Sequence, residues 1–489
     1  RIVYSQIGNQ EQSTDFFKNF LANSYEDLEG NNGFITDIFY FRDVFYMHTE
    51  QNLFARKLQP QQLETTDGDL INLGDATVFA APVQNLNSVP TGYAGNQHKQ
   101  ALAISESGVF FPDADSGKIF LLSKSLTELS DQGERNFFEE NLPSNFLKQF
   151  YELTGKEWPY EGVTSNLSVG LQSAYDTRHK RWIITKKDYN IISNKITYNT
   201  MDTLQNLYED IENGNVPFNE LIFNPTLYDT FFTVSGDTYL FTITDGIDFT
   251  NATYFENKSW TKSYCNLIQG WKSYHSYLPN YIYGTQSKLF SSIATDSNLW
   301  EHNIGEFQTY YGVKSPFIVE PVTTLDQVNT YTSPVVGYLA NVLEFDSTHE
   351  QWLEVDFDTF NKGVFYSTNQ SSGLVNLTIK NNNTPFASIN NTPGSLLVNK
   401  EEKNWSINNI RNNVTDNTQP LFTKNWSVLQ GGYFIDKEVN NNVIDFNKSL
   451  FTKEKLRDKF MVCRFIYDNP QNRKFNFKYM IDKSKVSYR

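Results

Sequence analysis

Short apolar segments that alternate with polar positions run through most of the chain and predict β-strands. The segments are rich in Val, Ile, Thr, Tyr and Phe, and Gly, Asn or Asp closes them, which is the pattern of consecutive hairpins. A single hairpin is marginally stable, so several must pack together to bury their apolar faces. The pattern is clearest in residues 34–58, 100–122, 170–188, 228–244 and 281–293.

Repeated hairpins of this kind predict an irregular, β-propeller-like meander over residues 1–315. The spacing between hairpins is uneven, and no repeated Trp-Asp or Asp-box signature marks separate blades, so we expect imperfect blades. Two short helices are predicted within this region. Ser13 can cap a helix at 14–27, and Ser144 can cap a second helix at 145–154 that Gly155 closes.

The composition of the chain changes beyond residue 315. Isolated apolar segments between Asn-rich, Thr-rich and Ser-rich loops predict a second, β-sandwich-like domain over residues 316–489. Near the end, KFMVCRFIYD and FNFKYMI predict two strands that are joined across Asn469–Arg473. The predicted fold class is therefore mainly β with few short helices.

Composition and charge limit the classes of function. Aromatic residues make up 15% of the 489 residues, which is enough side-chain area for large buried cores. Mean hydropathy is −0.50 and no apolar run approaches the ~18 residues of a membrane helix, so we expect no membrane segment. Lys and Arg total 41 against 56 Asp and Glu, and the net charge of −15 gives no chain-wide attraction for DNA phosphates. The densest basic stretch, at 178–187, is interpreted as a solvated hairpin and not as a binding patch.

The sequence contains no pattern typical of catalysis. Its six histidines form no HxH, HExxH or HxxxH spacing, and the nucleophile-elbow, Walker and dinucleotide-binding signatures are missing. Cys265 and Cys463 form no CxxC, so we expect two buried thiols. Asp113–Gly117 has carboxylates at calcium-loop spacing, but a hairpin turn explains every residue of it. We therefore predict no catalytic residue, no metal, no cofactor and no enzymatic activity.

One aromatic segment stands apart from the rest of the chain. Alternation along 271–277 places Trp271, Ser273, His275 and Tyr277 on one face of a strand, and Lys272, Tyr274 and Ser276 on the other. Both faces carry aromatics, so we expect the strand to be covered on both sides, with His275 as a satisfied histidine in an aromatic box. The motif residues that we assign to folding or assembly are Trp271, His275, Tyr277, Pro279, Trp300, His302 and Asn303.

The same segment resembles a known family. The sequence GWKSYHSYLPNYIYGTQSKLFS, followed by LWEHN and YYG, resembles the large tail proteins of crAss-like phages called muzzle or nozzle proteins. SAYDTRHKRWIITKKDY, WSINNIRNN, LRDKFMVCRFIYDN and the terminal KVSYR resemble further parts of those proteins. The quoted motifs cover roughly residues 165–489, and the earlier part of the chain fits only loosely.

The resemblance implies a structural protein of the virion tail. It implies a subunit of a nozzle ring, a homo-oligomer of six copies, around the DNA exit channel of a short-tailed phage, with roles in genome retention and ejection. The implied partners are tail ring proteins and phage DNA that passes without sequence-specific binding. Residue 1 is Arg and not Met, so we also expect the remainder of a precursor as a partner if the chain is processed.

Two other functions stay open from the residues alone. Exposed Tyr and Trp on a β scaffold could stack on sugars, as in a carbohydrate-binding protein at the host surface. Acidic pairs such as Glu139/Glu140 or Glu401/Glu402 could serve a propeller-fold glycoside hydrolase, although 56 acidic residues make such pairs common.

Overall fold

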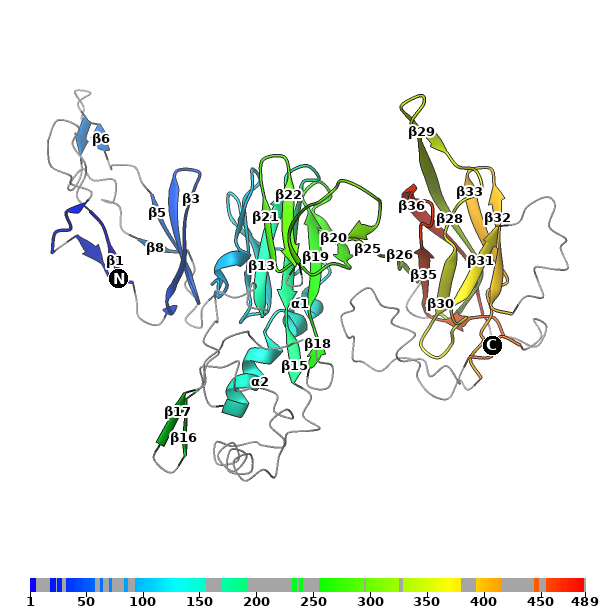
Figure 1. Cartoon of the computed structure of the whole chain (residues 1–489), viewed down its shortest axis with the longest axis horizontal. Helices are drawn as coiled ribbons and strands as arrows, with labels where there is room; N and C mark the ends of the chain where they lie inside the picture. Colours follow the sequence, from blue (N-terminus) through cyan, green and yellow to red (C-terminus); the bar gives the residue numbers. More distant parts are fainter. Residues whose placement is uncertain are drawn as a thin grey trace. The chain divides into compact units, whose positions relative to one another are not determined.

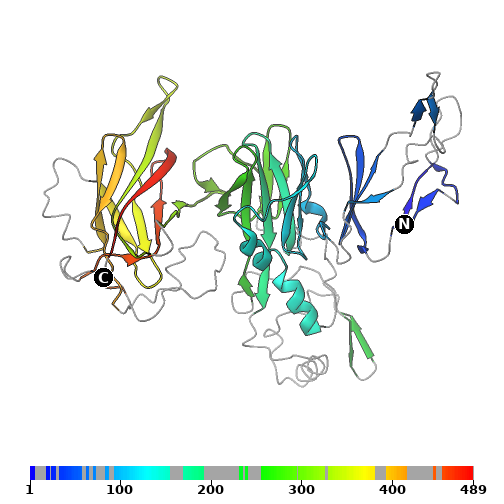
Figure 2. The same cartoon turned by 180° about the vertical axis from the view of Figure 1, so that it is seen from behind.

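The computed structural model describes most of the chain and divides it into two compact units, Arg1–His302 (unit 1) and Asn303–Arg489 (unit 2) (Figures 1 and 2). The structure describes residues 1–5, 18–22, 24–28, 32–57, 62–64, 70–72, 83–86, 93–154, 169–191, 231–234, 237–240, 255–293, 296–324, 329–379, 393–415, 444–447 and 454–487.

Unit 1 begins with two antiparallel sheets that share one core. The first sheet contains β3 (Ile35–Phe41), β4 (Val44–Thr49), β5 (Leu53–Lys57) and β8 (Gln84–Asn85). The second contains β9 (Ala103–Ile104), β10 (Val109–Asp113), β11 (Lys118–Leu122) and β12 (Leu126–Glu128). Phe39 and Leu53 of the first sheet cluster with Phe111 and Phe120 of the second, so alternate residues of the hairpins meet face to face.

A second pair of sheets completes the centre of unit 1. One contains β13 (Gly170–Asp176), β14 (Arg181–Lys187), β19 (Trp260–Cys265) and β20 (Gly270–His275), and the other contains β21 (Tyr281–Gly284), β22 (Leu289–Ile293) and β23 (Asp296–Glu301). Every residue of β13 is buried, so both faces of this strand are covered. Gly284 allows β21 to approach β13, because a Cβ there would lie 2.2 Å from the Tyr175 carbonyl oxygen.

Small two-stranded pairs and short helices make up the rest of the described part of unit 1. The pairs are β1 (Ile2–Val3) with β2 (Tyr25–Glu26), β6 (Gln62–Glu64) with β7 (Leu70–Asn72), β15 (Tyr189–Ile191) with β18 (Phe255–Asn257), and β16 (Phe231–Val234) with β17 (Asp237–Leu240). The helices are the 3₁₀ turn η3 (Lys99–Ala101), α1 (Arg135–Asn141) and α2 (Asn145–Thr154).

One of the two predicted helices is wrong at its C-terminal end. Of the predicted helix 14–27, residues 14–17 and 23 lie outside the described part of the chain. Tyr25–Glu26 forms β2, in register with Ile2–Val3, so pairing with the N-terminal strand replaces helix there. The second predicted helix occupies the same residues as α2.

The mainly β fold class and the five hairpins are confirmed, but a closed propeller is not. Each predicted hairpin is an antiparallel pair in the structure. The described sheets of unit 1 hold two, three or four strands, and strands of different sheets, such as β13 and β21, lie against each other.

Unit 2 is built on one eleven-stranded sheet, not on two separate sheets of a sandwich. It contains β26 (Phe317–Val319), β27 (Val322–Thr323), β28 (Tyr331–Asp346), β29 (Gln351–Glu354), β30 (Lys362–Tyr366), β31 (Val375–Ile379), β32 (Ser395–Glu401), β33 (Asn404–Asn408), β34 (Arg457–Asp458), β35 (Met461–Tyr467) and β36 (Lys474–Val486). The central strand β28 pairs with β33 along one edge and with β36 along the other. The predicted segments at 425–429 and 432–435 lie outside the described residues.

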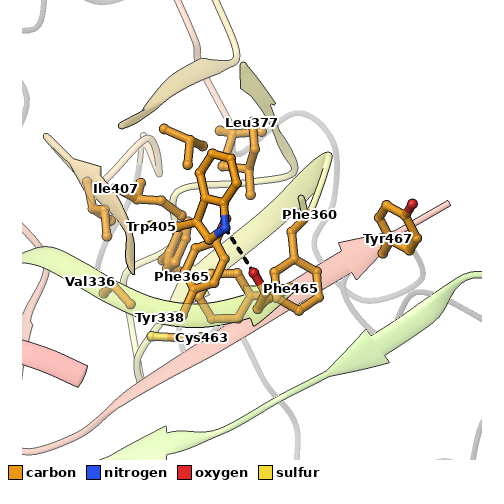
Figure 3. Packing of buried hydrophobic residues seen from close by; sticks show 14 of the residues in the cluster. Val336, Tyr338, Phe360, Phe365, Leu377, Trp405, Ile407, Cys463, Phe465 and Tyr467 are labelled. Atoms are coloured by element: carbon orange, nitrogen blue, oxygen red, sulfur yellow. Dashed lines mark hydrogen bonds between the residues drawn. The ribbon is translucent and has the colours of Figure 1, made fainter. Parts of the chain in front are cut away.

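The sheet of unit 2 folds over on itself around an aromatic core (Figure 3). Phe465 of β35 and Tyr338 of β28 are separated by four strands in the sheet order, yet their ring centroids lie 5.1 Å apart. Trp405 lies between the layers, and its Nε1 donates a hydrogen bond to the carbonyl oxygen of Ala340 at 3.1 Å. The fold therefore encloses its core as a sandwich would, but with a continuous hydrogen-bonded sheet.

The boundary between the two units falls earlier than the sequence predicted. The prediction placed it between residues 315 and 316, whereas the compact units divide after His302. The hairpin of β24 (Thr309–Tyr310) and β25 (Val313–Lys314) lies in unit 2. The residues before it are anchored there, because the Phe307 backbone N–H donates to Asn472 Oδ1 at 2.6 Å and Gln308 Nε2 donates to the Tyr467 carbonyl oxygen at 3.3 Å.

Candidate functional site

The seven motif residues do not form a single site. Three of them, His275, Tyr277 and His302, come together in unit 1, with His275–Tyr277 and Tyr277–His302 ring centroids each 5.0 Å apart. Trp271 belongs to a different cluster, and Trp300 lies on β23. The aromatic box around His275 is present, but it draws on only part of the predicted motif.

The two histidines of this cluster are neutral near pH 7. Burial, with a further contribution from the Arg181 charge, lowers the pKa of His275 to about 3 and that of His302 to about 4. His302 Nε2 lies 2.5 Å from Ser291 Oγ, within hydrogen-bond distance. Imidazoles with such low pKa values are weak proton acceptors, because a general base works best with a pKa near the working pH.

His275 is not the satisfied histidine that the sequence predicted. Its Nε2 is enclosed and makes no hydrogen bond with any residue that the structure describes. The neighbouring strand is tied in through the backbone, since Thr261 Oγ1 donates to the Tyr277 carbonyl oxygen at 2.7 Å. The cluster is therefore held by ring packing, by the hydrogen bond between Ser291 and His302, and by the Thr261 hydroxyl on the Tyr277 main chain.

Trp271 forms one wall of an aromatic cage around a lysine. Its Nε1 donates to the Leu129 carbonyl oxygen at 3.1 Å, and its ring centroid lies 4.6 Å from that of Phe138. Lys262 Nζ lies 4.1 Å from the centre of the Tyr274 ring and 2.7 Å from Glu134 Oε2. Cation–π attraction and the carboxylate together offset part of the cost of burying this ammonium group.

The cage shows that β20 is covered mainly on one side. Tyr274 is 54% exposed, so the prediction that both faces of this strand are covered is wrong. The strand alternates between half-buried and exposed residues, and Tyr274 uses its ring to cover Lys262 and not to enter the core. Burial lowers the pKa of Lys262 to about 8, and no pattern in the sequence indicates this buried lysine.

The remaining motif residues serve local geometry. The Pro279 carbonyl oxygen accepts a hydrogen bond from Gln172 Nε2 at 2.7 Å, and Gln172 Oε1 accepts one from the Ile282 backbone N–H at 3.1 Å. Trp300 Nε1 donates to Asp296 Oδ2 at 3.1 Å. Asn303 is the first residue of unit 2 and has a φ of 65°, a left-handed conformation that Asn tolerates.

The basic stretch 178–187 is only partly solvated, which corrects its interpretation as an exposed hairpin. Lys186 is 2% exposed and its Nζ donates to Asp188 Oδ2 and to the carbonyl oxygens of Asn141 and Pro143, all within 2.8 Å. The Asp188 carboxylate also accepts from the backbone N–H groups of Asn145 and Phe146. Asp188, which lies between β14 and β15, thus caps α2 and neutralises a buried lysine, a role that the sequence did not reveal.

Asp113–Gly117 is a hairpin turn, as the residues predicted. Asp113 pairs with Lys118 in the β10–β11 register, and its Oδ1 accepts from Gln97 Nε2 at 3.2 Å and from the Ser116 backbone N–H at 3.3 Å. Across the described ranges, no group of three or more His, Cys, Asp or Glu side chains is arranged to hold a metal ion.

Two further features concern the cysteines and the membrane. Cys265 and Cys463 are both free and buried, so this prediction is confirmed. No helix in the described part of the chain combines the length and apolar character needed to span a bilayer.

Comparison with known proteins finds a family match for part of the chain. No curated protein matches it. Residues 1–155 match the family model described as Crassvirus muzzle protein. This match covers the part of the chain that the quoted motifs did not, so the resemblance over 165–489 stays a prediction. Residues 1–155 are therefore similar to crAss-like muzzle proteins, which are components of the virion tail.

Proposed function

We propose that this protein is a crAss-like muzzle protein, a non-enzymatic subunit of a ring that surrounds the DNA exit channel of the tail. The match of residues 1–155 to the Crassvirus muzzle family is the observation that supports this proposal most directly. In such a ring six copies would contact one another and the tail ring proteins, together with the remainder of the precursor if the chain is processed. The ring would retain the packaged genome and open a path for its ejection.

The charge of the chain is compatible with a conduit. With a net charge of −15, the protein has no chain-wide attraction for phosphates, so DNA would pass without being held by release of counterions. The most basic stretch of unit 1 supports the same view, because Lys186 is committed to a buried ion pair and Arg181 pairs with Asp176. These cations are used within the fold.

The chemistry of the described histidines supports a structural role. The motif histidines have pKa values of about 3 and about 4 and are packed against aromatic rings. The acidic residue Glu139, one of the hydrolase candidates, forms an ion pair with Arg135 on the surface of α1 at 2.8 Å. A role in folding is enough to explain these contacts, and no catalysed reaction is needed to account for them.

Light scattering and negative-stain imaging of the purified chain test the ring. One chain has a mass of 56.5 kDa, so a six-copy ring would have about six times this mass and would show a central channel. A single-chain mass at virion-like salt, both alone and with its tail ring neighbours, would contradict the proposal.

Fluorescence anisotropy with a labelled DNA duplex tests passage without binding. We expect only weak binding, with a dissociation constant on the order of 10⁻⁴ M or higher at physiological salt. Nanomolar binding that weakens steeply with salt would show that the protein attracts DNA, and it would contradict passage without binding.

A further inference from the structure

Unit 2 carries a hairpin that combines exposed apolar side chains with many acidic residues. Residues 343–358, here called the acidic hairpin, contain six Asp and Glu and no Lys or Arg. Phe345 and Trp352 face each other across β28 and β29 and are 49% and 43% exposed, and Leu353 and Phe357 are also exposed. Figure 1 shows this hairpin extending beyond the other strands of the sheet. Aromatic side chains exposed together are typical of a protein interface.

Part of the charge of the acidic hairpin is not neutralised within the chain. Arg473 pairs with Glu344 and Asp358, and Lys400 pairs with Asp356. Glu350 and Glu354 are exposed, and neither forms an ion pair with a residue that the structure describes. The tip therefore presents carboxylates beside its aromatic rings.

The last strand of unit 2 carries the opposite charge. Residues 478–486 of β36, here called the basic edge, contain Lys478, Lys483 and Lys485, all exposed, and one acid. That acid, Asp482, accepts a hydrogen bond from Ser333 Oγ at 3.0 Å. Within the described ranges, no ion pair involves any of the three lysines. Tyr479, Ile481 and Val486 are 40–45% exposed on the same segment.

The tip of the acidic hairpin and the lysines Lys483 and Lys485 of the basic edge lie toward opposite ends of β28, so they do not neutralise each other within one chain. Phe345 is paired with Trp352 at one end of this strand, and Thr332 is paired with Lys485 near the other. Thirteen residues separate Phe345 from Thr332 in one strand, which corresponds to roughly 40 Å at ~3.3 Å per residue. This separation exceeds the ~8 Å Debye length at physiological salt several times over.

The form of β36 favours side-chain docking over the addition of another strand. β28 is its only partner among the described strands, so its outer edge is open. The register with β28 is irregular on both sides of the segment, at Leu339/Ala340 and at Thr332/Val335. Bulges and lysines on an edge oppose continuous pairing with a further strand.

We propose that the acidic hairpin of one copy docks against the basic edge of a second copy. Different surfaces at opposite ends of one unit make a head-to-tail contact, and repetition of such a contact closes a ring when the rotation allows it. Charge complementarity orients the encounter, while Phe345 and Trp352 meet Tyr479 and Ile481. This inference rests on the proposed ring and names the surfaces that would build it.

Disulfide trapping between two differently labelled full-length chains tests the contact. One chain carries Ser347→Cys in the turn of the hairpin, and the other carries Val486→Cys on the basic edge. Both native cysteines are buried, so the introduced thiols are the reactive ones. We expect a mixed cross-linked dimer on oxidation and no efficient cross-link within either preparation alone. Lys403→Cys, an exposed position in the turn between β32 and β33, replaces the hairpin probe as the matched control.

Charge reversal adds a second arm to the test. Glu350→Lys with Glu354→Lys, or Lys483→Glu with Lys485→Glu, should lower the mixed cross-link about tenfold or more, and combining both reversals should restore it. If light scattering shows oligomers but the mixed cross-link does not form, this contact is overturned and the ring is not. Cross-links of the hairpin probe with itself would overturn the head-to-tail arrangement, and a chain that stays monomeric would overturn both proposals.

Discussion

Unit 1 is expected to lose stability as the pH falls below 6.5, because four of its histidines are held neutral in the folded state. Burial lowers the pKa of His48 and His275 to about 3, and that of His98 and His302 to about 4. In the unfolded chain the same imidazoles bind protons near pH 6.5. The unfolded state therefore binds more protons below pH 6.5, and the free energy of unfolding decreases as the pH falls. Above this pH both states are neutral and these groups add no pH dependence.

The expected slope follows from the number of protons. Near pH 6 the four histidines bind roughly three protons in the unfolded state. Each such proton lowers the free energy of unfolding by about 1.4 kcal/mol for every unit that the pH falls. Burial raises the pKa of Asp37 to about 6, so this carboxyl takes up a proton in the folded state and opposes the loss by about half a proton. Asp113 and Asp115, whose pKa values burial also raises, act in the same direction at lower pH. The net loss is about 3.5 kcal/mol per pH unit near pH 6, a large share of the 5–15 kcal/mol of a typical domain.

Urea unfolding at pH 7.5, 6.5 and 5.5, monitored by hydrogen exchange, measures how the free energy of unfolding of each unit changes with pH. The amides of β10 and β14 report on unit 1 and those of β33 and β35 on unit 2, whose sole histidine is the exposed His349. His48→Phe should reduce the slope of unit 1 near pH 6 by about 1 kcal/mol per pH unit, the share of one histidine. Phe should be tolerated there because His48 already packs against Phe39 and Phe111. His179→Gln, at a side chain that is 46% exposed, is the matched control. Equal slopes in both units, or an unchanged slope for His48→Phe, would refute the reasoning.

Further changes test the buried contacts of the fold. Asp188→Ala should lower the free energy of unfolding of unit 1 by about 3–5 kcal/mol in urea unfolding, because Lys186 would stay buried without its counter-ion. In the same assay Glu139→Ala, which breaks the exposed pair with Arg135, should cost less than about 0.5 kcal/mol. His275→Ala should impair folding or assembly, as seen by circular dichroism and light scattering, and a folded, assembling variant would count against the aromatic-box interpretation. Gly284→Ala should destabilise unit 1 by about 1–3 kcal/mol in thermal unfolding, since the new Cβ would meet the Tyr175 carbonyl oxygen at 2.2 Å. The two native thiols should react with a thiol reagent only after unfolding, because both are buried and burial raises the pKa of the Cys463 thiol; rapid labelling of the native protein would contradict this.

The hairpins could be predicted from the sequence because their signals are local. In the β3–β4 hairpin the turn residues Arg42 and Asp43 both have positive φ, and the strands on either side alternate as their sequence does. The strand at Tyr25–Glu26 could not be predicted, because its partner Ile2–Val3 lies more than twenty residues away. Strand pairing at such distances depends on the packing of the whole unit and overrides local helix propensity.

The buried lysines could not be found from the pattern for the same reason. Lys186 lies in a basic stretch that is typical of a solvated surface, but its ammonium group is satisfied by carbonyl oxygens more than forty residues earlier in the chain. Lys262 is satisfied by Glu134 and by the Tyr274 ring, which come from different elements. Only the assembled core supplies these partners, and a charge is buried only where such partners exist.

The segment that matches the family depends on later residues of the chain for its packing. It ends at residue 155, directly after α2, but the matched segment completes its core with later residues. Phe110 stacks on Trp182 at 5.2 Å, and Phe138 packs against Trp271 at 4.6 Å. Asp188 caps the first turn of α2. Exposing these aromatic faces would cost several kcal/mol, and losing the cap would add about 1 kcal/mol. The matched segment is therefore expected to fold together with β13, β14, β19 and β20. The aromatic motif around Trp271 therefore belongs to the same folding unit as the muzzle-type sequence, although the two are separate along the chain.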